Sequence, residues 1–203
     1  IFFLNILLSL PALYYVFVLK IYFIHSHGLS FNLSDKVLII STIIFFYFIP
    51  FLTTIYKSNK IYFLSKKSIY VFSFSIILYF YLIPNFNYDL NIAGGGIFLH
   101  LSYFLFNSSI LFLIVSLISI LVICYILLID LKKNFLLILI FFLLVPQTHI
   151  FHKYFDPILL ICIPLLFQIS IDKLFKKKYL SVLYFYFLSF YIVNLTNSLF
   201  IKF

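Results

Sequence analysis

Long apolar runs alternate with short polar connections along this chain of 203 residues. A helix needs roughly 17–25 apolar residues to cross about 30 Å of hydrocarbon. By this measure the pattern predicts seven membrane spans, at 2–22, 37–56, 68–84, 110–129, 135–147, 157–171 and 179–200. The fifth and sixth runs are short, so we expect those helices to be tilted, to extend into the interface or to pack where the membrane is thin.

A further apolar run, Ile97–Phe106, is too short to cross a membrane. It follows Gly94–Gly96, which are three of the chain's four glycines. We therefore expect the backbone there to turn or to approach another segment closely. The run predicts an interfacial or re-entrant helix that leads into the span at 110–129. The alternative is one long tilted helix over 97–129 that is broken near Asn107.

The composition agrees with a membrane environment. Hydrophobic residues make up 66% of the chain and charged residues 9%, against roughly 45–50% and about 25% in soluble domains. We predict an all-α fold: a polytopic transmembrane bundle of about seven spans in which residues 1–203 form a single domain. The chain has no Met, even at position 1, so we expect it to be a C-terminal fragment of a longer multi-pass protein of the plasma (inner) membrane.

The lysines predict the orientation of the spans. Ten of the 14 lysines lie in the connections 57–67, 130–134 and 172–178, which alternate along the chain. Cytoplasmic loops normally hold the excess of lysine, so the chain should begin inside and end outside. The outer side then receives three segments, 25–36, 85–109 and 147–157. The net charge of +9 does not indicate nucleic-acid binding, because these lysines do not form a basic face on a soluble module.

The densest polar patch lies in the outer segment 147–157, at the predicted membrane boundary. Its candidate substrate-binding residues are His149, His152, Lys153, Tyr154 and Asp156. On a helix, His149, His152 and Asp156 would share one face. Ionisable groups at membrane depth are costly and therefore indicate a functional site. Lys153 and the imidazoles suit a phosphate or pyrophosphate at the headgroup level, and Asp156 would orient one of them.

Other interpretations of these polar residues stay open. A connecting loop is normally polar, so the patch is equally well read as plain interfacial anchoring. Metal binding by two histidines and Asp156 is a weaker interpretation, because the spacing matches no established signature. We identify no cofactor, and a divalent cation remains an option. His100, within the short apolar run, faces an outer cavity or reaches for the interface.

The same segment resembles part of a known superfamily. The string His152–Pro157, followed by Ile158–Leu160, is similar to the late periplasmic or luminal segment of type C glycosyltransferases, where a His-Lys or Arg-Tyr pattern precedes an apolar helix. These multi-spanning enzymes use a polyprenyl-phosphate-linked sugar as donor. The resemblance implies that His152 and Lys153 contact the lipid phosphate. The catalytic acidic residue of that superfamily follows its first span, which we expect to lie upstream, so no catalytic residue is assigned.

The resemblance favours a glycosyltransferase that works on the outer membrane face. Its partners would be membrane lipids and a lipid-linked sugar donor, without nucleic acid. One alternative is a transporter or flippase for a lipid or polysaccharide precursor, for which paired broken helices or inverted repeats are expected; the sequence reveals neither. A second alternative is a polysaccharide polymerase or ligase, which would call for arginines in the outer loop, and the chain has no Arg.

Overall fold

The computed structural model describes residue 14 and residues 32–52, 55, 66–89, 94–145, 149–167 and 177–200. Regular secondary structure in these residues is entirely helical, as predicted. The helices are α3 Leu33–Phe48, η2 Ile49–Phe51, α5 Lys66–Leu82, η3 Ile83–Asn85, α6 Gly96–Phe106, α7 Ile110–Ile129, α8 Leu131–Leu143, η4 His152–Tyr154, α9 Asp156–Leu165 and α10 Lys177–Phe200. The span predicted at 2–22 lies, apart from Tyr14, outside the described residues.

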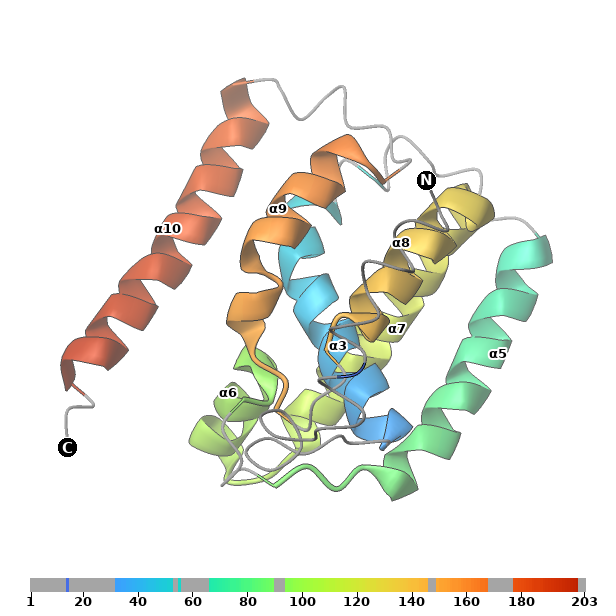
Figure 1. The fold of residues 1–203 in the computed structure, drawn as a ribbon, viewed down its shortest axis with the longest axis horizontal. Coiled ribbons are helices and arrows are strands. Elements are labelled where there is room, and N and C mark those ends of the chain that lie inside the picture. Colours follow the sequence, from blue (N-terminus) through green and yellow to red (C-terminus); the bar gives the residue numbers. More distant parts are fainter. Residues whose placement is uncertain are drawn as a thin grey trace.

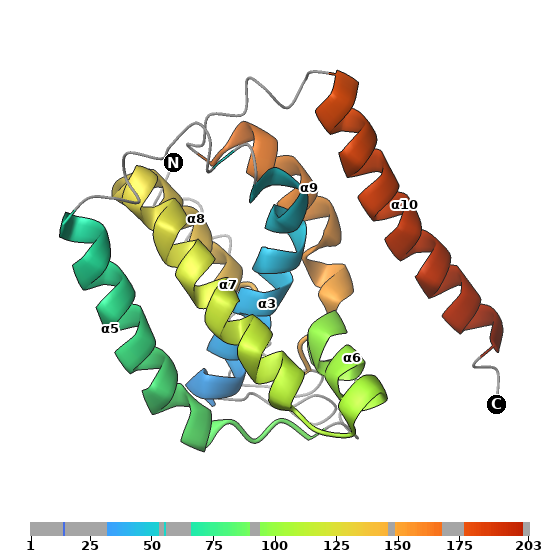
Figure 2. The same cartoon turned by 180° about the vertical axis from the view of Figure 1, so that it is seen from behind.

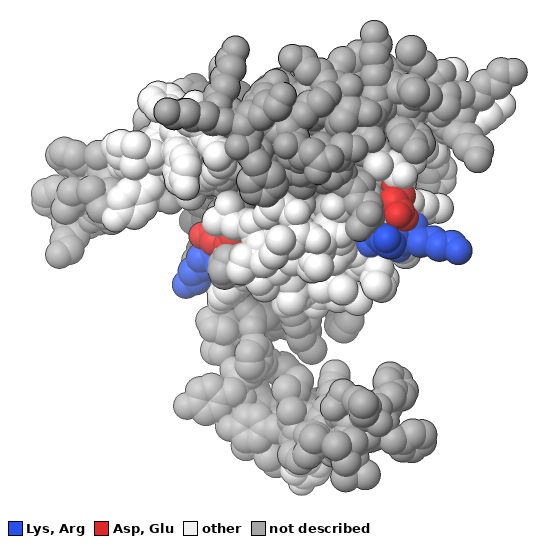
Figure 3. Space-filling view, turned by 90° about the horizontal axis from the view of Figure 1, so that it is seen from above, with Lys and Arg blue, Asp and Glu red and all other residues white. Residues whose placement is uncertain are grey.

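Three stretches of the described chain are long and apolar enough to cross a membrane. They are Leu33–Phe51, Ser68–Asn85 and Ile110–Ile129, and they agree with the predicted spans at 37–56, 68–84 and 110–129. Helix α5 leaves its outward face apolar, with Tyr70 and Ile77 76% and 67% exposed. In the view of Figure 3 the described charged side chains form two small groups at the edges of an uncharged surface. Such a surface suits an integral membrane protein.

Helices α3, α7 and α9 run in one direction through the bundle, and α5, α8 and α10 run in the other (Figures 1 and 2). One end of the bundle holds the start of α3, the end of η3 and the turn before α7. We call it the asparagine end, because these places are occupied by Asn32, Asn85 and Asn107. Helices α5, α8 and α10 begin at the opposite end, which we call the lysine end because each starts with lysines in its first turn. This arrangement agrees with the alternation of lysine-rich connections.

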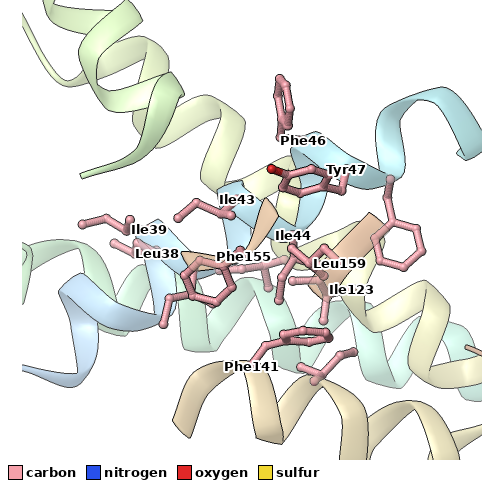
Figure 4. Packing of buried hydrophobic residues seen from close by; sticks show 14 of the residues in the cluster. Leu38, Ile39, Ile43, Ile44, Phe46, Tyr47, Ile123, Phe141, Phe155 and Leu159 are labelled. Atoms are coloured by element: carbon pink, nitrogen blue, oxygen red, sulfur yellow. The ribbon is translucent and has the colours of Figure 1, made fainter. Parts of the chain in front are cut away.

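Helix α3 lies at the centre of the bundle and is buried along most of its length. Ile43 and Ile44 of α3 face Phe155, Leu159 and the side chains of α7 and α8 (Figure 4). The buried Ser41 and Thr42 in the middle of α3 are small, and Thr42 donates a hydrogen bond to the carbonyl of Ile39 at 2.7 Å. Small hydroxyl residues that bond to their own helix allow close packing inside an apolar environment.

Helices α6 and α9 have about half the length of a membrane span. Their 11 and 10 residues extend about 17 and 15 Å at 1.5 Å per residue. Helix α6 begins inside the bundle and runs to the asparagine end, and α9 begins inside and runs to the lysine end (Figures 1 and 2). Within the described residues, the run predicted as a span over 157–171 is helical as far as Leu165, and residues 168–171 lie outside the described part of the chain.

The chain reverses direction between α6 and α7. Asn107 ends α6 in the left-handed conformation, with φ 48°, which asparagine tolerates better than most residues. The Ser102 hydroxyl donates to the carbonyl of Ser108 at 2.6 Å and accepts the N–H of Phe112 at 3.1 Å. The chain forms two separate helices here, so the alternative of one long tilted helix over 97–129 is wrong. That α6 is an interfacial or re-entrant helix stays a prediction.

Candidate functional site

The non-helical segments that precede α6 and α9 meet inside the bundle. The Gly95 N–H donates to the carbonyl of Ile150 at 2.9 Å, and the Ile150 N–H donates to the Tyr88 hydroxyl at 3.5 Å. On the other side of the glycines, Nε2 of His100 lies 2.6 Å from the carbonyl oxygen of Gly94. We call Gly94–Gly96 together with His149–Asp156 the half-helix junction.

Glycine is required where the two segments touch. Gly94, Gly95 and Gly96 have φ values of 116°, 90° and 76°, in the region that L side chains rarely adopt. A Cβ on Gly94 would lie 2.8 Å from the carbonyl oxygen of Ile150 and 2.9 Å from the hydroxyl oxygen of Tyr88. The predicted close approach of the glycine segment to another part of the chain is therefore confirmed.

The junction lies deeper in the bundle than the sequence predicted. A Cβ on Gly96 would contact Ile39 and Ile43 of α3, which are about 9 and 15 Å along the helix from Leu33 at 1.5 Å per residue. His152 stacks on Tyr47, about 21 Å from Leu33 on the same scale. The segment expected at the outer membrane boundary thus enters the bundle before α9 begins.

His152 is surrounded by aromatic rings from two helices. Its ring lies 5.2 Å from that of Tyr47 and 5.0 Å from that of Phe46, both on α3. The ring of Phe190 on α10 lies 5.8 Å away. The side chain of His152 is 12% exposed, and this burial lowers its pKa to about 4. The imidazole is therefore neutral at neutral pH.

Asp156, the first residue of α9, lies beside this imidazole. Its Oδ1 is 3.5 Å from Nε2 of His152, and burial raises the pKa of the Asp156 carboxyl. Neither ring nitrogen of His152 nor Oδ1 of Asp156 has a hydrogen-bond partner in the described part of the chain. Buried polar groups are nearly always paired, so this pair is an exception that calls for a functional explanation.

The other predicted site residues occupy different surroundings. Residues 149–151 are not helical, so the expectation that His149 shares a helix face with His152 and Asp156 is wrong. The ring of His149 stacks on Phe151 instead, at 6.1 Å. Lys153 is exposed, and its Nζ lies 4.9 Å from the centroid of the Phe151 ring and 5.7 Å from that of Tyr154. The described residues contain no group of three or more metal-ligating side chains.

Sequence reasoning missed the residues that hold the loop before the glycines. The Asn32 side chain accepts the Ser34 N–H at 3.1 Å and donates to Oδ2 of Asp35 at 2.7 Å. Oδ1 of Asp35 in turn accepts the Asn87 N–H at 2.9 Å. Asparagine at the helix cap with an acidic residue three positions later resembles a capping box, and this signal was available. Tyr88 offered no signal, because it is one of 17 tyrosines.

Comparisons with protein-family models, with curated proteins and with solved structures found no match for this chain.

Proposed function

We propose that this chain belongs to a membrane transporter or flippase for a lipid or polysaccharide precursor, and that the substrate passes the half-helix junction. The supporting observation is the pair α6 and α9, two half-length helices that start next to each other and run to opposite ends of the bundle. Transporters often build their substrate sites from such discontinuous helices near the middle of the membrane. This is the feature that distinguishes a transporter from the alternatives.

The chemistry of the junction supports the same proposal. Non-helical backbone at membrane depth is tolerated where it is buried in protein or lines a water-filled path. The exposed ammonium of Lys153 makes no ion pair in the described part of the chain. Lys153 directly follows His152, the residue surrounded by aromatic rings. A lipid-linked precursor would keep its tail in the bilayer while Lys153 contacts its phosphate.

A flippase assay tests this proposal. The protein is reconstituted in liposomes with a fluorescent polyprenyl-phosphate lipid, and dithionite quenching measures the movement of the lipid between leaflets. Wild type should move the lipid faster than protein-free liposomes, and Lys153→Ala should slow it. Lys132→Ala is the matched control, because Lys132 is exposed at the lysine end, away from the junction. A wild-type rate equal to that of empty liposomes would contradict the proposal.

A second candidate function is glycosyl transfer from a polyprenyl-phosphate sugar. It is favoured by the position of Lys153, whose ammonium lies over two aromatic rings within the segment that resembles type C glycosyltransferases. A phosphate leaving group needs such a cation. Sugar incorporation should fall in His152→Ala and Lys153→Ala and stay normal in Lys132→Ala. Normal incorporation in all three variants, at equal expression, would exclude these residues from donor binding.

A further inference from the structure

The His152–Asp156 pair combines features that a structural contact does not need. Its Nε2 to Oδ1 distance of 3.5 Å exceeds the roughly 2.7–2.9 Å of a charge-assisted hydrogen bond. Both atoms are buried and have no other partner among the described residues. A contact that served stability alone would be paired or replaced by apolar side chains.

We propose that the His152–Asp156 pair binds and releases a proton, and that this proton is coupled to movement of the substrate. The coupling rests on the transport function proposed above, and the proton binding stands on the geometry of the pair. Ionisable pairs at membrane depth are the usual carriers of protons in transporters.

Among the described groups around His152, Asp156 is the carboxylate that would pair with the protonated imidazole. From α3 the ring meets Phe46 and the phenol of Tyr47. From α10 it meets Phe190, and the nearby Tyr186 hydroxyl donates to the carbonyl of Phe46 at 3.1 Å. Within the junction, Lys153, Tyr154 and His149 are the remaining titratable neighbours, and the ammonium of Lys153 lies over the rings of Phe151 and Tyr154.

We call the rings of Phe46, Tyr47 and Phe190 around His152 the aromatic cage. This cage explains how a proton would be released. In this conformation the rings of α3 and α10 exclude water, which disfavours the imidazolium. If α10 moves away from Phe46 and Tyr47, water reaches the imidazole and its ordinary pKa of about 6.5 returns. A hydronium ion then gives its proton to Nε2 and becomes water, the charge of the pair rises by one, and an N–H···O bond to Asp156 forms. Closure of the cage breaks this hydrogen bond and returns the proton to water as hydronium, and no other bond changes.

Helix α10 supplies one wall of this cage. Of the three rings around His152, Phe190 is the one from α10. Asp156, the other member of the pair, is the first residue of α9. A motion of α10 would therefore change both the hydration of His152 and the width of the junction. Two states with different proton affinity are the requirement for coupling.

A histidine NMR titration tests proton binding directly. The protein is labelled with ¹³C,¹⁵N-histidine in micelles, and its five histidines are assigned with His152→Phe and His149→Gln. We expect the His152 resonance to titrate well below the ordinary histidine value of about 6.5. Asp156→Asn should lower the midpoint by about 1 pH unit or more, because a nearby carboxylate favours the imidazolium. Phe190→Ala should raise the midpoint, because it opens the cage.

The outcomes separate the two proposals. A His152 midpoint at the ordinary histidine value of about 6.5, or one unchanged in Asp156→Asn, would overturn the assignment of this buried pair as the proton site, whatever the transport assay shows. Coupling is measured with a pH-sensitive dye inside the liposomes of the flippase assay, where His152→Phe should abolish lipid-dependent proton movement. If wild type moves lipid without protons, coupling is refuted. If it moves no lipid while the NMR result holds, the proton-binding pair stands and the transport function is refuted.

Discussion

The substitution Gly94→Ala tests whether the contact between the two half-helix segments holds the bundle together. The change adds one methyl group at a φ of 116°, where an L residue costs about 1–2 kcal/mol. The new Cβ would lie 2.8 Å from the Ile150 carbonyl oxygen, which also accepts the Gly95 N–H. Separation of the segments weakens that hydrogen bond and repacks Tyr88, for about 2–3 kcal/mol more. The free energy of unfolding should fall by about 3–5 kcal/mol.

Gly96→Ala is the matched control for this measurement. Gly96 also has a positive φ, 76°, but its added Cβ would meet the side chain of Ile43 at 3.3 Å. The control therefore keeps the backbone strain of about 1–2 kcal/mol and omits the backbone clash. Unfolding in detergent is followed by far-UV circular dichroism during titration with sodium dodecyl sulfate. Equal losses in the two variants would refute the reasoning, because backbone strain alone would then account for the cost of Gly94→Ala.

Three further predictions concern residues around the junction. The Asp35 carboxylate accepts the Asn87 N–H on one oxygen and the Asn32 amide on the other. Asp35→Asn keeps only one acceptor oxygen, so one donor loses its partner and the free energy of unfolding should fall by about 1–3 kcal/mol in the same titration. Tyr88→Phe removes the hydroxyl that accepts the Ile150 N–H. The free energy of unfolding should fall by about 0.5–1.5 kcal/mol and no more, because this hydrogen bond is long, at 3.5 Å. Because the pKa of His152 is low, the unfolded chain binds more protons than the folded chain between pH 6.5 and about 4. The free energy of unfolding of wild type should therefore fall by about 3 kcal/mol as the pH falls through this range. His152→Phe, measured by the same titration at each pH, should lose less, and an identical pH dependence would show that His152 is not buried.

Local pattern was sufficient for the long helices. Helix α7 occupies 110–129 as predicted, because polar residues bound an uninterrupted apolar run on both sides. The break at Asn107 was also visible, since asparagine and serines interrupt the apolar pattern there. In each case the deciding signal lies within a few residues of the boundary. Whether the bundle has seven spans is a prediction that extends beyond the described residues.

The depth of the junction could not be predicted in this way. The run 157–171 is apolar apart from Gln168 and Ser170 near its end. Nothing in it indicates that the chain has already entered the bundle when α9 begins at Asp156. That position depends on the contact of Gly95 with Ile150 and of His152 with Tyr47, which join residues far apart in the sequence. The glycines predicted a close approach, but the partner that they approach is set by tertiary packing.

The pairing of the two non-helical segments also explains why the His152–Asp156 pair stands out. Each segment alone would leave backbone groups without partners in an apolar interior, at a cost of several kcal/mol per group. Together they satisfy one another, since Gly95 donates to Ile150 and Ile150 donates to Tyr88. Within the described chain, the buried side-chain atoms left without a partner are those of His152 and Asp156. A fold that pairs the surrounding groups and leaves these atoms without a hydrogen bond singles them out as the place where the proton proposed above would bind.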